Sequence, residues 1–147
     1  ERRMYQKEAT DELNEKILNA LSNKLKVIFC IGEKRNEIKK RNTVLQSQLK
    51  ALPKNFSFNE IIIAYEPVWA IGTGLTPTVN EIEKIHLNIR SLLKKYVGKN
   101  SEKVSILYGG SVNSKNAHDI LSLKNVDGAL VGGASLDARE FCKIIDS

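Results

Sequence analysis

The stretch IIIAYEPVWAIGTGLTPT, residues 61–78, decides how this chain is interpreted. It opens with a short apolar run rich in β-branched residues, which is typical of a strand buried on both faces. Glu66 stands at the C-terminal end of that run, and Pro67, Gly72 and Gly74 bound the apolar segment after it. Glycines at its ends give such a loop freedom to move, and loops at strand ends commonly carry function. We therefore expect a carboxylate base on a strand end beneath a hydrophobic lid.

Three further apolar runs predict strands of the same buried kind, at residues 27–31, 104–108 and 127–131. Each run ends in glycine: Gly32 follows the first, and glycine pairs at residues 109–110 and 132–133 follow the other two. The polar and glycine residues therefore fall at the C-terminal ends of the strands. In α/β folds this is the face that carries the chemistry.

Helical periodicity fills the segments between the strands. Thr10 is expected to cap a first helix, whose apolar stripe is Leu13, Ile17, Leu21 and Leu25. Residues 78–81 form a capping box for a long helix, and Asp137 caps the last helix, with Phe141, Ile144 and Ile145 as its apolar positions. Shorter helices are predicted between these, within residues 43–52 and 117–121.

Alternating helices and parallel-type strands define an α/β fold, and residues 1–147 show no linker that would divide them into two domains. Four strands cannot close a barrel, so the inner face of the sheet would stay exposed. The sheet is therefore either open and covered by other helices, or one half of a larger barrel. Because the first residue is Glu1 rather than Met, we also expect that the sequence does not begin at a natural start.

Composition excludes some classes of protein. The 147 residues are 41% hydrophobic and 27% charged, and the longest apolar runs fall far below the roughly 20 residues of a membrane span. Cys30 and Cys142 form no C-x-x-C motif and have no histidine at ligand spacing, which favours reduced thiols in a cytosolic protein over a disulfide. The net charge of +6 and clusters such as residues 39–41 and 94–95 raise the possibility of nucleic-acid binding. These clusters lack interleaved aromatic residues, so solvated helix faces are favoured.

The glycine pairs suggest an anion site. Without side chains, several backbone N–H groups can converge on a phosphate, helped by the dipole of a following helix and by the Ser111 hydroxyl. A single glycine pair is more often a plain turn, but two pairs beside a strand-end glutamate favour the phosphate interpretation.

Glu66 could be an ordinary surface or ion-paired carboxylate, yet its place beneath an apolar lid favours a base that becomes desolvated when the lid closes. Trp69 is interpreted as an anchor of the lid rather than a core residue. His86 and His118 lie away from the strand ends and are expected to be structural or solvent-facing.

These residues carry a resemblance to a known family. The motif AYEPVWAIGTG at residues 64–74 resembles the signature of the triosephosphate isomerases. ERR at residues 1–3, CIGE at 30–33, YGGSV at 108–112 and DGALVGGASL at 127–136 resemble the same family in order and spacing. The resemblance covers almost the whole chain.

The resemblance implies the C-terminal half of a (β/α)8 TIM barrel, with four parallel strands alternating with helices. The family interconverts dihydroxyacetone phosphate and glyceraldehyde 3-phosphate in glycolysis and gluconeogenesis. It does so as a cytoplasmic homodimer without a cofactor or metal. By resemblance, Glu66 is the base that moves a proton between C1 and C2 through an enediolate. Neither nucleic acid nor membrane is an expected partner.

Further roles follow from the resemblance alone. The positions that match phosphate-binding residues are Gly72, Ser111, Gly132 and Gly133. The positions that match the lid are Pro67, Val68, Trp69, Ala70, Ile71, Gly72, Thr73, Gly74, Leu75 and Thr76. Glu33 matches a residue that contacts the open lid near Trp69, and Cys30 matches one packed beside the base. Glu1 and Tyr108 match supporting residues.

The chain also departs from the family. The electrophilic histidine of the family precedes the position of Glu1, and the Asn and Lys that contact substrate come from a first strand; none of the three is present. We therefore expect the chain alone to be nearly inactive. At the position of Pro77, many members of the family carry an alanine whose backbone N–H forms a hydrogen bond, in the closed lid, with the tyrosine that Tyr108 matches. Proline has no N–H, so that bond cannot form here. Contacts between Ser111 and Gly74 are expected to carry more of the lid closure.

An alternative stays open from the sequence. The chain could be a non-catalytic half-barrel that binds phosphorylated ligands and assembles with itself or with a second chain.

Overall fold

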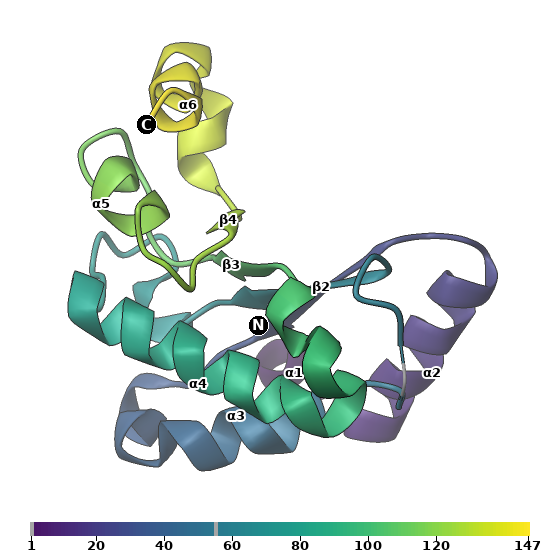
Figure 1. The fold of residues 1–147 in the computed structure, drawn as a ribbon. Helices are drawn as coiled ribbons and strands as arrows, with labels where there is room; N and C mark the ends of the chain where they lie inside the picture. Colours follow the sequence, from purple (N-terminus) through teal and green to yellow (C-terminus); the bar gives the residue numbers. More distant parts are fainter. Residues whose placement is uncertain (1, 55) are drawn as a thin grey trace.

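The computed structural model describes residues 2–54 and 56–147, so the expectation for Glu1 lies outside the described residues. Its centre is a parallel sheet of β1 (Val27–Ile31), β2 (Ile61–Tyr65), β3 (Ile106–Tyr108) and β4 (Gly128–Ala129). The strand order β1-β2-β3-β4 follows the chain (Figure 1). Each connection therefore steps in the same direction along the sheet, which is the winding of a (β/α)8 barrel.

Helices and single turns connect the strands. The α-helices are α1 (Arg2–Tyr5), α2 (Thr10–Ser22), α3 (Arg41–Leu49), α4 (Val79–Val97), α5 (Ala117–Leu121) and α6 (Ala138–Ile145). The 3-10 turns are η1 (Arg35–Lys40), η2 (Val68–Ala70), η3 (Gly98–Lys103) and η4 (Gly133–Leu136). Figure 1 shows α3 and α4 lying together beneath the sheet, while α6 stands beyond β4 at the C-terminal end. The predicted alternation of helices and strands is confirmed.

The core lies between the sheet and the helices α3 and α4. Leu45 and Leu49 of α3, and Ile89 of α4, are fully buried against strand residues such as Ile63. Each such side chain contributes about 1.5–3 kcal/mol when it leaves water. The capping box predicted at the start of α4 is present, because Thr78 and Glu81 each bond the other's backbone N–H. The start of α4 is therefore fixed by local sequence.

β1 differs from the prediction of strands buried on both faces. Phe29 and Ile31 are buried, but Ile28 is 46% exposed and Cys30 is also exposed. The described residues supply a layer of helices on one face of this strand only, so alternate side chains face the open side. This is the exposed inner face expected of an incomplete barrel.

β3 and β4 are shorter than the predicted runs at residues 104–108 and 127–131. The Ile106 N–H donates to the Asp127 carboxylate at 2.7 Å, and Asp127 also pairs with Arg90 at 2.6 Å. The Asp127 N–H in turn donates to the Ile106 carbonyl at 3.0 Å, so Asp127 bonds Ile106 through both its side chain and its backbone. Val104 is still buried, so the apolar pattern predicted the burial of this residue correctly. It overestimated the length of β3.

Three helix-end predictions are wrong in detail. Thr10 is the first helical residue and Ala9 occupies the cap position, although the acidic first turn is present. α2 ends at Ser22, and Leu25 is 60% exposed because the chain turns away through Lys24 at φ 60°. In α6 the Asp137 cap is confirmed, but Ile145 is 65% exposed and only Ile144 is buried.

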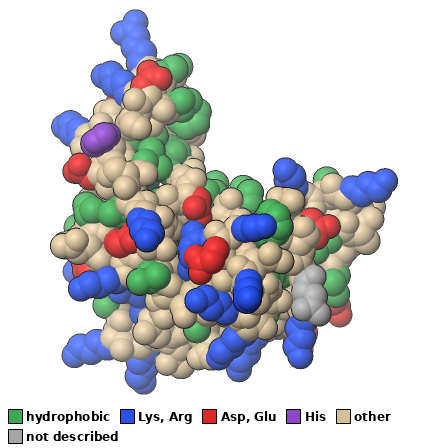
Figure 2. All heavy atoms as spheres, viewed as in Figure 1, with side chains coloured by type: hydrophobic (Ala, Val, Ile, Leu, Met, Phe, Trp, Pro, Cys, Tyr) green, Lys and Arg blue, Asp and Glu red, His purple; other side chains and the backbone are tan. Residues whose placement is uncertain are grey.

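The surface is basic without a single basic stripe on the face in view. Figure 2 shows Lys and Arg side chains scattered over this face with acidic side chains among them. Within the described residues, no helix combines the length and hydrophobicity that crossing a bilayer requires.

Candidate active site

The backbone of Glu66 is fixed by the sheet. Its N–H donates to the Ile31 carbonyl at 2.7 Å, which extends the pairing of β1 with β2 by one residue. On the other side, the Gly109 N–H donates to the Tyr65 carbonyl at 2.8 Å. Glu66 therefore stands at the C-terminal edge of the sheet on a rigid support, as the sequence predicted.

Two glycines make room for Glu66. A Cβ atom on Gly32 would lie 1.7 Å from the Glu66 carbonyl oxygen, and one on Gly109 would lie 2.6 Å from its Cγ. Neither position can therefore carry a side chain while Glu66 keeps this place.

Gly109, the first glycine of the pair after β3, does not play the part expected of it. The Gly109 N–H belongs to the sheet and cannot meet an anion, and a Cβ on Gly110 would lie 2.2 Å from the Tyr108 hydroxyl. These glycines accommodate Glu66 and Tyr108, so the expectation that their N–H groups converge on a phosphate is wrong for Gly109. The spatial requirement could not be found from a glycine pair alone.

The lid begins with η2, and Glu33 holds it. The Trp69 indole Nε1 donates to Glu33 Oε1 at 3.1 Å, and the Val68 N–H donates to the Glu33 carbonyl at 3.1 Å. The predicted contact between Glu33 and Trp69 is thus present. Glu33 is 0% exposed and also accepts hydrogen bonds from the Tyr65 hydroxyl, at 3.1 Å, and from Arg41 Nε, at 2.8 Å. The sequence had assigned Arg41 to a solvated basic cluster, so its role at Glu33 was missed.

The tip of the lid is exposed and internally bonded. The Thr73 hydroxyl donates to the Trp69 carbonyl at 3.0 Å and accepts from the Leu75 N–H at 3.2 Å. Gly72 and Gly74 have φ of 65° and 75°, a region that favours glycine. These torsions let the chain reverse within the tip.

The lid is tied to the loop after β3 by Ser111. Its hydroxyl donates to the Ala70 carbonyl at 2.7 Å. The contact expected between Ser111 and Gly74 is therefore replaced, in this conformation, by one to Ala70. Pro77 is buried directly before the capping box that starts α4.

The structure brings the predicted anion residues and the base together. Glu66, Gly72, Ser111, Gly132 and Gly133 all line one cavity of about 380 Å³. Cβ atoms on Gly132 and Gly133 would meet open space, so the backbone there is accessible to a ligand. The helix expected to support the anion by its dipole is only the four-residue turn η4, so that part of the expectation is wrong. Individual N–H groups remain as the donors, and the Ser111 hydroxyl becomes one only when it leaves the Ala70 carbonyl.

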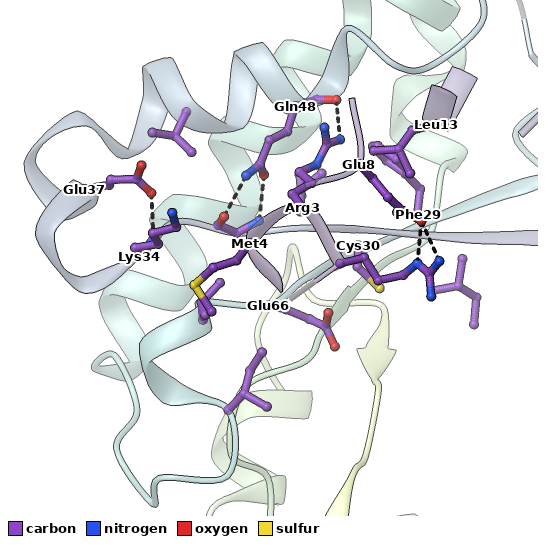
Figure 3. Close-up of a pocket in the computed structure, with 17 residues that line it drawn as sticks. Arg3, Met4, Glu8, Leu13, Phe29, Cys30, Lys34, Glu37, Gln48 and Glu66 are labelled. Atoms are coloured by element: carbon purple, nitrogen blue, oxygen red, sulfur yellow. Dashed lines mark hydrogen bonds and ion pairs between the residues drawn. The ribbon is translucent and has the colours of Figure 1, made fainter. Parts of the chain in front are cut away.

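A second cavity, of about 590 Å³, is shown with the residues that line it in Figure 3. Cys30 and Ile28 line it from the open face of β1, and Glu66 lines it as well. Cys30 and the base thus share a cavity. Gln48 fixes the turn after β1, because its side chain donates to the Gly32 carbonyl and accepts from the Gly32 N–H, both at 2.8 Å.

The histidines stand apart from both cavities. His86 is 0% exposed, its Nδ1 lies 3.3 Å from the Asn125 carbonyl oxygen, and its ring meets Tyr65 edge-on at 5.9 Å. Burial lowers the pKa of His86 to about 4, so the ring is neutral. His118 is exposed. The prediction that both are structural or solvent-facing is confirmed. Among the described residues, no group of three or more acidic, His or Cys side chains could hold a metal ion.

Tyr108 is buried, and burial raises the pKa of its hydroxyl. Within the described part of the chain this hydroxyl makes no hydrogen bond. Pro77 stands where the resemblance places the partner of this hydroxyl. Because proline has no N–H, it cannot form that hydrogen bond.

Comparisons with known proteins agree on one family. The family model described as triosephosphate isomerase matches residues 1–147. The chain is 46% identical to the triosephosphate isomerase of Phocaeicola vulgatus, over 100% of this chain and 61% of that protein. It is 48% identical to that of Mesomycoplasma hyopneumoniae strain 232, over 99% and 58%.

Solved structures agree. The crystal structure of triosephosphate isomerase from Bartonella henselae matches with a TM-score of 0.89 and 37% identity, covering 99% of this chain and 59% of that one. The chain therefore spans between 58% and 61% of the length of these relatives.

Proposed function

The chain belongs to the triosephosphate isomerase family, and on that premise we propose that the natural polypeptide carrying it interconverts dihydroxyacetone phosphate and D-glyceraldehyde 3-phosphate. The observation that carries this proposal is the cavity shared by Glu66 with Ser111, Gly132 and Gly133. A phosphate held by those residues would leave the carbon chain of a triose within reach of the carboxylate.

Glu66 supplies the base. Its carboxylate takes a proton from C1 of dihydroxyacetone phosphate, which leaves an enediolate across C1 and C2, and the resulting carboxylic acid returns the proton to C2. The hydroxyl proton on O1 moves to O2 in the same conversion, so two protons change place within the molecule, no net oxidation state changes and no second substrate is consumed. A fixed carboxylate suits this step, because a positioned base contributes about 10²- to 10⁴-fold. The sheet bonds on both sides of Glu66 provide the fixed position.

The lid protects the intermediate. Residues 67–76 begin beside Glu66, and Ser111 already joins the lid to the anion cavity through Ala70. Closing this segment over a bound phosphate would remove water from the carboxylate and strengthen its interaction with the substrate. Glu33 and Trp69 fix the end from which the lid moves.

Polarising the substrate carbonyl needs a group that we place outside residues 1–147. Neither histidine of the chain lines the cavities defined by the described residues. We propose that the missing electrophile comes from a part of the natural polypeptide beyond this chain. The family also supports a cytoplasmic homodimer for the whole protein, with a small phosphorylated triose as its ligand.

An isomerase assay tests the proposal. The natural polypeptide should convert glyceraldehyde 3-phosphate to dihydroxyacetone phosphate, whereas the isolated 147-residue chain should be slower by at least about 10²-fold, the usual contribution of one acid–base partner. A full rate from the isolated chain would overturn the need for an outside electrophile. Phosphate binding without isomerisation by the natural polypeptide would favour the alternative of a non-catalytic phosphate-binding half-barrel.

A further inference from the structure

Glu140 links two loops that are distant in sequence. It lies in α6, and both of its carboxylate oxygens engage Ser114 in the loop between β3 and α5. The Ser114 N–H donates to Oε1 at 2.7 Å, and the Ser114 hydroxyl donates to Oε2 at 3.0 Å. A side chain that uses both oxygens on one residue holds that residue in both position and orientation.

The loop that Glu140 holds is the one that carries Ser111. The Asn116 side chain donates to the Ser111 carbonyl at 3.1 Å and accepts from the Asn113 N–H at 2.9 Å, so residues 111–116 form one bonded turn. Ser111 then reaches the lid at Ala70. Any shift of Ser114 would therefore move Ser111, which lines the anion cavity.

The segment that carries Glu140 also carries Gly132 and Gly133, which line that cavity. Gly132 and Gly133 precede α6, and the Gly132 carbonyl accepts from both the N–H and the hydroxyl of Ser135, at 2.9 and 2.7 Å. Asp137 caps the helix by accepting from the Arg139 and Glu140 N–H groups, at 2.9 and 3.0 Å. Figure 1 shows α6 following η4 beyond β4, at the same end of the molecule as α5. These hydrogen bonds therefore fix the orientation of Glu140 relative to Gly132 and Gly133.

We propose that Glu140 is a positioning residue for phosphate binding, because it fixes Ser111 relative to Gly132 and Gly133, which line the same cavity. The identity of the anion rests on the proposed function. Glu140 itself does not line the cavity. It acts through Ser114 and contributes no donor to the ligand.

The sign of the effect separates this role from simple electrostatics. A carboxylate close to an anion site repels the anion, so removing its charge would tighten phosphate binding if charge were its only influence. If Glu140 instead positions the Ser111 loop, removing it should weaken binding despite the lost repulsion. The Ser114 bonds also lower the pKa of Glu140, which keeps it ionised at neutral pH.

Calorimetric titration of inorganic phosphate into the natural polypeptide tests the proposal without reference to catalysis. Glu140→Ala should raise the dissociation constant by about 2- to 12-fold, the range that corresponds to one ordinary hydrogen bond. Glu140→Gln should have a smaller effect in the same direction, because its amide oxygen can still accept one of the two bonds. The matched control is Glu15→Gln, an exposed glutamate on α2, which should leave the dissociation constant unchanged.

A double-mutant cycle with Ser114→Ala supplies the second criterion. Ser114→Ala keeps the backbone bond and loses the hydroxyl bond, so it should weaken phosphate binding slightly in the parent and not at all in the Glu140→Ala background. Tighter binding, or binding unchanged within about 1.5-fold, by a folded Glu140→Ala protein would overturn the proposal. So would an unsubstituted protein that binds no phosphate. Phosphate binding that responds as expected in a protein without isomerase activity would refute the proposed function and leave this inference standing.

Discussion

Replacing Glu33 with Gln should destabilise the protein through the base of the lid. The Glu33 carboxylate is 0% exposed and accepts hydrogen bonds from Arg41, Tyr65 and Trp69. Gln is nearly the same size, so packing is preserved while the charge is lost. The Arg41 side chain, 15% exposed, would then face an uncharged amide.

The magnitude follows from that burial. Breaking a buried ion pair by removing one partner costs about 3–5 kcal/mol, and the residual exposure of Arg41 places Glu33→Gln near the lower limit, about 3 kcal/mol. Trp69→Phe removes only the indole donor and should cost less, about 1.5–3 kcal/mol for a bond to a charged group. Both values refer to the free energy of unfolding.

Urea unfolding followed by circular dichroism measures these effects, with Glu15→Gln as the control that should stay within about 0.5 kcal/mol of the parent. Arg41→Met should also be destabilising, because it leaves the Glu33 charge buried without its cation. The double variant Glu33→Gln/Arg41→Met should cost less than the sum of the two single changes. A cost below about 1 kcal/mol for Glu33→Gln, or strictly additive effects, would refute a buried pair that supports the lid.

Two further substitutions test the buried polar side chains His86 and Tyr108. The pKa of His86 is about 4 in the folded protein and about 6.5 when unfolded, so the unfolded state binds the proton first as the pH falls. Stability should therefore decrease between pH 6.5 and 4, by about 3 kcal/mol in total, and His86→Phe should remove this dependence while His118→Gln keeps it. Tyr108→Phe should leave stability unchanged or raise it by up to about 1 kcal/mol, since the buried hydroxyl makes no hydrogen bond in the described structure. The same variant should change kcat by less than about twofold, because Pro77 offers no N–H to a tyrosine latch; a tenfold loss of kcat would show that the Tyr108 hydroxyl acts in the reaction through another partner.

Features encoded within a few residues were predictable from the sequence. β2 and the placement of Glu66 follow from an uninterrupted apolar run and the carboxylate that ends it. The start of α4 follows from the capping box at Thr78 and Glu81, whose bonds span three residues. The contact between Glu33 and Trp69 was reached through the resemblance to the family, not through local pattern.

Features made by tertiary contact were not predictable. Arg41 was assigned to a solvated cluster because nothing in its local sequence points to Glu33. Asp127 bonds the Ile106 N–H through its side chain from 21 residues away. Glu140 bonds Ser114 across 26 residues, and the need for a glycine at position 109 becomes visible only when the Glu66 side chain is placed against it. In each case the two residues meet only because the folded chain packs their segments together, and this packing cannot be read from a single sequence.

Glu66→Gln in the natural polypeptide tests the central claim most directly. The account predicts that kcat for triose phosphate isomerisation falls by about 10²- to 10⁴-fold, because the amide cannot take the proton from carbon. The dissociation constant for inorganic phosphate should stay the same or fall, since the donors to the anion come from Ser111 and the backbone around Gly132 and Gly133 and the substitution removes a negative charge from the same cavity. A variant that keeps kcat within tenfold of the parent would contradict the assignment of Glu66 as the base.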